Sequence, residues 1–229
     1  MCAVYFETDM SISPNEPMTS SAKATRDRRI DFFRGAALLF IYIDHIPGNF
    51  LSRITLHNFG FSDAAELFVL LAGVSAAFAY GRRRDATSAV LQRAWTIYVA
   101  HVALLLAVAA ALALIASYTK HPSLMRHVAL APFADDLGKA LVGVLTLTLQ
   151  PPFLDILPLY VALLVWLPVL LALSRIRRWL GLGISLVIWV GANATHINAP
   201  TMSGNGWYFN PLTWQLLFAL GVYIGMRKG

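Results

Sequence analysis

Six apolar runs constrain this chain more than any other feature, because each is close to the length that crosses a lipid bilayer as a helix. Such a helix needs about 20 mainly apolar residues. The runs occupy residues 31–48, 63–81, 94–117, 154–174, 180–197 and 211–226. Only 13% of the residues are charged and 58% are hydrophobic, whereas an average soluble domain is about 25% charged. The sequence therefore predicts an all-α fold, a polytopic membrane helix bundle of about six transmembrane helices.

Basic residues gather in every second connection between these runs. The groups are Lys23 to Arg29, Arg82 to Arg93, Arg175 to Arg178, and Arg227 with Lys228. Because basic loops stay on the cytoplasmic side, the pattern predicts a cytoplasmic N-terminus and a multi-pass protein of a cytoplasmic membrane. The net charge of +6 is thereby explained by topology, and binding of nucleic acid is not expected.

Two segments are predicted not to cross the membrane. Residues 1–25 are rich in Ser, Thr and Pro and lack the apolar core of a signal peptide, so they are expected to form a disordered cytoplasmic tail before a membrane domain at 26–229. Residues 138–150 are too short to span easily, and an interfacial or re-entrant segment is expected there.

Arg34 and His45 are the first candidates for a functional site. They lie eleven residues apart in the first run, which places both on one helix face, about 16 Å apart along the axis. Ionisable groups within a membrane helix are costly and usually face a bundle interior or a pathway. A structural histidine and an arginine that reaches the headgroups remain the simpler alternatives.

Asp63 and Glu66 open the second run and share a helix face. Since the loop before them is short, the first two helices are expected to be antiparallel neighbours, with His45 close to one of these carboxylates. A carboxylate beside an imidazole fixes its tautomer and raises its basicity, which is the arrangement of a general base.

The connection at 198–211 is dense in amide and aromatic side chains, with Trp207 and Asn210 among them. This composition suits either a sugar-binding surface or an interfacial aromatic belt. Elsewhere, His101 is expected to be a satisfied core histidine, and no histidines have the spacing of a metal site. An oxyanion stabiliser would be needed for acyl transfer, and Gln150, Asn210 and Gln215 are weak candidates.

Several stretches together resemble the glucans-biosynthesis protein C family, the succinyltransferases of osmoregulated periplasmic glucans, within the wider integral-membrane acyltransferase-3 superfamily. The matching segments are Arg28 to Gly35, Ile43 to Pro47, Phe59 to Val69, Asp155 to Tyr160 and Tyr208 to Gln215. The superfamily hallmark is an Arg separated from a His by ten residues in the first helix, and Arg34 and His45 match it.

The resemblance implies an acyltransferase of the bacterial inner membrane with acyl-coenzyme A as co-substrate, no bound cofactor and no metal, and a periplasmic glucan or other glycan as acceptor. It implies that His45 is catalytic, that Arg34 binds the donor, and that Asp63 or Glu66 orients His45. Trp207, Asn210 and Gln215 are the acceptor-binding candidates.

The same resemblance implies about ten helices, whereas six are predicted here. The chain is therefore expected to be a C-terminally truncated member, and an inactive truncated protein is one alternative function. A proton-coupled transporter is the other, because Pro158 and Pro168 would suit broken helices and intramembrane charges also mark transport paths.

Overall fold

The computed structural model describes residues 28–58, 62–121 and 123–228, and within these ranges it contains helices and no strands. The predicted tail at 1–25 and the first residues of the predicted membrane domain lie outside the described residues. The six longest helices coincide with the six apolar runs: α1 (Arg28–Asp44), α2 (Ala64–Tyr80), α3 (Ala86–Thr119), α7 (Ile156–Ile176), α8 (Leu180–Thr195) and α9 (Pro211–Lys228). The all-α prediction is confirmed.

Two of these helices, α3 and α7, are long and apolar enough to cross a membrane alone, and α2 and α8 are shorter apolar helices. Six transmembrane helices and a cytoplasmic N-terminus therefore stay predictions. Helix α7 is continuous through Pro168, and Pro158 falls in its first turn, where a missing N–H removes no intrahelical bond. A helix broken at these prolines is not observed.

Helices α2 and α9 make the closest packing in the described chain. A Cβ atom on Gly73 would collide with the carbonyl of Phe218, and one on Gly221 would collide with the carbonyl of Leu70. Gly225 also lies against α2, since a Cβ atom there would come within 2.6 Å of Ala77 Cβ and 2.9 Å of the Val74 carbonyl. Small residues four apart, such as Gly221 and Gly225 on α9, allow this approach of two backbones.

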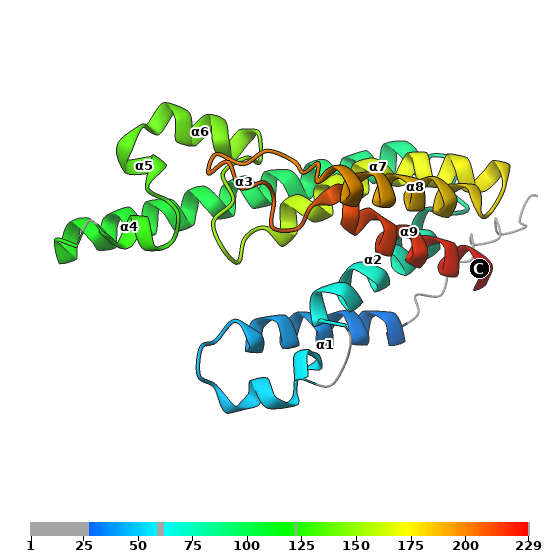
Figure 1. Cartoon of the computed structure of the whole chain (residues 1–229), viewed down its shortest axis with the longest axis horizontal. Helices are drawn as coiled ribbons and strands as arrows, with labels where there is room; N and C mark the ends of the chain where they lie inside the picture. The colour runs from blue at the N-terminus through cyan, green and yellow to red at the C-terminus, as the bar shows by residue number, and fades with distance from the viewer. Residues whose placement is uncertain (1–27, 59–61, 122, 229) are drawn as a thin grey trace, which may run out of the picture.

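Helices α3 and α7 run antiparallel along the longest axis of the molecule (Figure 1), and Arg175 Nη2 at the end of α7 donates to Arg83 O just before α3 at 3.0 Å. Leucines of α7 and residues of α2 and α9 form the main core, with Leu163, Leu167 and Phe218 fully buried. Helix α3 begins eight residues before the predicted run, because residues 86–93 continue the helix with more polar side chains.

Three short helices gather against the C-terminal half of α3 (Figure 1): α4 (Ser123–His127), α5 (Pro132–Asp135) and α6 (Leu137–Leu145). Tyr98 donates its hydroxyl to Leu145 O at 2.7 Å, which fixes the end of α6 beside α3. With nine residues, α6 is too short to cross a bilayer, as predicted for this segment; its location at a membrane interface stays a prediction.

Helix α1 lies at one side of the molecule and packs on α2 (Figure 1). The two 3₁₀ helices η1 (Phe50–Ile54) and η2 (Leu56–Asn58) follow it. Ala37 is fully buried, while the apolar side chains on the outer face of α1 are more than half exposed at Phe32, Phe33, Leu39 and Tyr42. The outer face of α1 thus presents apolar surface away from the protein.

Candidate functional site

His45 is the first residue after α1, and the hydrogen bond of its ring defines its chemistry. Nδ1 lies 2.5 Å from the carbonyl oxygen of Ile41. Because a carbonyl only accepts, Nδ1 carries the hydrogen in the neutral ring, and the free lone pair is on Nε2. The ring packs edge-on against Phe153 with 4.9 Å between centroids. His45 is exposed, so Nε2 is accessible as a proton acceptor.

Asp155, which directly precedes α7, is a carboxylate within electrostatic reach of His45. Burial raises the pKa of the Asp155 carboxyl, and the nearby His45 ring offsets part of this effect. The ionised carboxylate of Asp155 stabilises the protonated imidazole of His45. Residues 153 and 155, which are over 100 positions from His45 in the sequence, thus form its surroundings.

Asp63 and Glu66 make other contacts than the sequence suggested. Asp63 is the N-cap of α2 and its carboxylate accepts from Ala64 N–H at 2.5 Å, while Glu66 Oε2 accepts from Asp63 N–H at 3.3 Å. This reciprocal capping box satisfies backbone donors at the start of the helix. An acid followed by Glu three residues later is a capping signal, and it was readable in the sequence.

Arg34 lies on α1, half-buried, with its guanidinium 5.6 Å from the centre of the Phe68 ring. Its Nε is buried without a hydrogen-bond partner among the described residues. The hydroxyl of Tyr160, on the second turn of α7, lies near enough to interact with the charges of Arg34 and Arg93. Tyr160 on α7 is thus within electrostatic range of one arginine on α1 and one on α3, and the unpartnered Nε of Arg34 is a donor that an anion can use.

The segment 153–160 joins the two halves of this candidate site. Its beginning contacts His45 through Phe153 and Asp155, and Tyr160 interacts with Arg34. Because α1 ends at Asp44 and His45 follows it, the predicted shared helix face of Arg34 and His45 stays a prediction. Sequence reasoning did not assign Asp155 and Tyr160 to the site, although both belong to the motif Asp155 to Tyr160 that resembles the family.

The three acceptor-binding candidates make structural hydrogen bonds. Trp207 is buried and donates Nε1–H to Pro200 O at 3.0 Å. Asn210 caps α9, accepting from Leu212 N–H at 3.0 Å. Gln215 is buried and links α9 to α8 through Ser185 O at 2.8 Å, while its Oε1 has no partner among the described residues. An Asn-Pro pair is typical of a helix N-cap and N1, so the role of Asn210 was readable in the sequence.

The remaining two residues that the sequence analysis considered are Gln150 and His101. Gln150 is half-buried and donates to Leu147 O at 3.0 Å. His101 is fully buried on α3, but neither ring nitrogen has a hydrogen-bond partner among the described residues. The prediction of a satisfied core histidine is thus wrong, since the apolar packing around α3 offers its ring no acceptor or donor. Within the described ranges, no three His, Cys, Asp or Glu residues are grouped as metal ligands would be.

Comparison with known proteins connects these residues to a family. The family model described as OpgC protein matches residues 26–229. No curated protein and no solved structure matches the chain. The matched region contains every residue of the candidate site, from Arg34 to Gln215.

Proposed function

Since this chain belongs to the OpgC protein family, a membership that indicates a glucan-modifying role of the acyltransferase type, we propose that it is a membrane O-acyltransferase. It moves an acyl group, of the succinyl class, from a cytoplasmic acyl-coenzyme A to a hydroxyl of a periplasmic glucan. The proposal includes a multi-pass location in the bacterial inner membrane, which the two long apolar helices support.

The observation that carries the proposal is the hydrogen bond from His45 Nδ1 to Ile41 O, because it leaves the free lone pair on Nε2 of an exposed ring. His45 Nε2 removes the proton of the acceptor hydroxyl as its oxygen attacks the thioester carbonyl. The new C–O bond forms, the C–S bond breaks, and the leaving thiolate takes the proton back from His45. Asp155 stabilises the imidazolium between these two transfers.

The donor is proposed to bind at Arg34, with Arg93 and Tyr160 completing the site. Coenzyme A carries phosphates, and guanidinium groups bind phosphate oxygens through two parallel hydrogen bonds. Arg34 is about 16 Å from His45 along the helix axis, and the extended thiol arm of the donor is expected to cover this separation. The unpartnered Nε of Arg34 is one donor available to such a ligand.

The test is glucan modification in cells that lack their own glucan acyltransferase. Periplasmic glucans from cells expressing the wild-type chain are expected to gain a succinyl-sized mass, and His45→Ala is expected to abolish it, with a loss of at least about 100-fold in rate for a missing general base. His121→Ala, which removes an exposed histidine just after the C-terminal end of α3, is the matched control. A membrane-inserted wild type that adds no mass, or an active His45→Ala, would contradict the proposal.

A further inference from the structure

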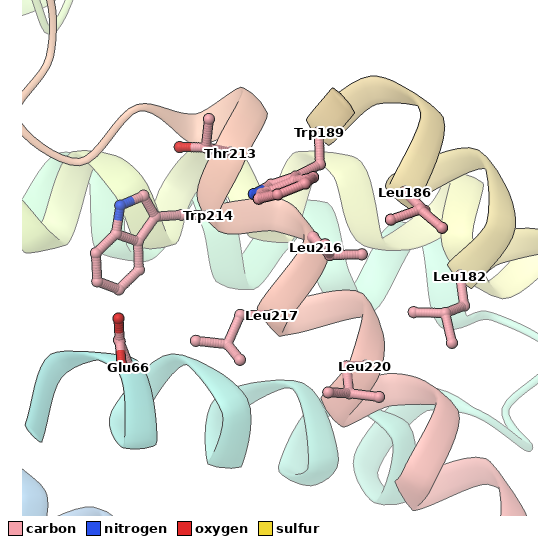
Figure 2. Close-up of a pocket in the computed structure, with 9 residues that line it drawn as sticks. All are labelled: Glu66, Leu182, Leu186, Trp189, Thr213, Trp214, Leu216, Leu217 and Leu220. Carbon is pink, nitrogen blue, oxygen red and sulfur yellow. The ribbon is translucent and has the colours of Figure 1, made fainter. Parts of the chain in front are cut away.

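An open groove of about 550 Å³ lies between α8 and α9, with one carboxylate from α2 at its end (Figure 2). This volume is in the range of small-molecule sites, about 300–1,000 Å³. Leu182, Leu186, Leu217 and Leu220 supply most of its length. No part of the proposed reaction uses it, because His45 and Arg34 are absent from its lining.

The polar groups of the groove are gathered at one end. Glu66 belongs to the first turn of α2, and Thr213 and Trp214 belong to the first turn of α9. Figure 2 shows the Glu66 carboxylate pointing toward the Trp214 ring, while Leu182 and Leu220 lie at the opposite end. The groove therefore has a charged aromatic end and an apolar remainder, which matches an amphiphile with a polar head and an apolar tail.

The charge of Glu66 determines which kind of headgroup binds at this end of the groove. A carboxylate attracts a cation and repels an anion, and an indole ring adds cation–π attraction. Glu66 has accepting capacity to spare, because a carboxylate has about four lone-pair sites and the structure assigns one weak bond, 3.3 Å long, to Asp63 N–H. Thr213 donates its hydroxyl to Asn210 O at 3.0 Å, so it is already engaged.

The geometry points to a binding site for a phospholipid whose headgroup carries a primary ammonium. One of its two acyl chains lies along the four leucines, and its ammonium sits between the carboxylate of Glu66 and the ring of Trp214. A bilayer supplies such a ligand through the open side of the groove, and an anionic phospholipid of the same chain length binds less well because Glu66 repels its head.

Trp189 and Trp214, which both line the groove, provide the measurement. The full chain is placed in phosphatidylcholine vesicles that contain the same fraction of either phosphatidylethanolamine or phosphatidylglycerol, brominated on the acyl chains so that contact quenches tryptophan fluorescence. The wild type is expected to bind brominated phosphatidylethanolamine about threefold more strongly, as one partly exposed charge contact allows. Equal quenching by the two lipids would overturn the proposal and indicate unselective lipid contact.

Substitutions of Glu66 and Asp63, the two acids of the capping box, distinguish binding in the groove from a general effect of negative charge near it. Glu66→Gln is expected to remove the preference, and Glu66→Asp, which keeps the charge, is expected to retain it. Asp63→Asn makes the same change in charge three residues away, on an exposed side chain outside the groove, and is expected to leave the preference intact. Loss of selectivity in Asp63→Asn, or its persistence in Glu66→Gln, would overturn the proposal. No acyl donor is present, so this outcome is independent of the proposed transferase activity.

Discussion

The α2–α9 contact and the surroundings of α1 use opposite means of holding helices together. At the first, glycines bring two backbones together, and Gly73 and Gly221 Cα atoms leave no room for a larger residue. At the second, Arg34, Asp44 and His45 make polar or aromatic contacts, and Arg34 Nε and Asp44 Oδ2 are buried without partners in the described residues. The closest backbone packing and the candidate reactive groups therefore lie at different helix contacts.

The largest loss of stability is expected when a side chain is forced between α2 and α9. Gly221→Leu places atoms where the Leu70 carbonyl lies, and such overpacking is expected to cost about 3 kcal/mol or more. Thermal unfolding and gel filtration in detergent would measure the loss. Gly191→Leu on α8 is the matched control, because nothing lies within 4 Å of its Cβ position. Equal stability of the two variants would show that the close contact is unimportant.

The polar contacts around α1 are tested at Thr55, which is fully buried. Its hydroxyl donates to Asp44 Oδ1 at 2.5 Å. Thr55→Val removes the donor and leaves Asp44 less satisfied, so a loss of about 1.5–3 kcal/mol is expected for a hydrogen bond to a charged group.

The double variant that carries both Thr55→Val and Asp44→Ala is the control for Thr55→Val alone. Removing both partners of a hydrogen bond is less costly than leaving one of them buried and unpaired, so the double variant is expected to recover part of the lost stability. A double variant less stable than Thr55→Val alone would show that Asp44 has other favourable contacts. Both values come from thermal midpoints under identical detergent conditions.

The smallest expected effect is a dependence of the thermal midpoint on pH. Burial raises the pKa of Asp155, so the folded state binds this proton more tightly than the unfolded state, and its stabilising contribution is lost as pH rises through the raised pKa. Asp155→Asn is expected to flatten this decline in thermal midpoint above about pH 4. Asp136 is the opposite control, because hydrogen bonds from Lys139 lower its pKa and its contribution is lost as pH falls. Identical slopes in wild type and Asp155→Asn would refute the assignment.

The helices could be predicted from the sequence because their signal is local. All six apolar runs correspond to long helices, and the capping roles of Asp63 and Asn210 follow from short patterns. The surroundings of His45 could not be predicted in the same way. The loop after α1 forms two 3₁₀ helices, and the contact with Phe153 and Asp155 joins segments that are distant in the chain. Nothing in local periodicity specifies such a contact.

Helix α3 has a consequence for how the protein sits in a bilayer. Its 34 residues measure about 51 Å, and fitting them within about 30 Å of hydrocarbon would need a tilt of about 54°, beyond the usual range of roughly 0–40°. The polar turns 86–93 are therefore expected to project some 12 Å past the apolar layer. Arg83 lies just before this projecting part of α3, and its carbonyl accepts a hydrogen bond from Arg175 at the end of α7. The length of α3 therefore sets the distance between Arg83 and the membrane surface.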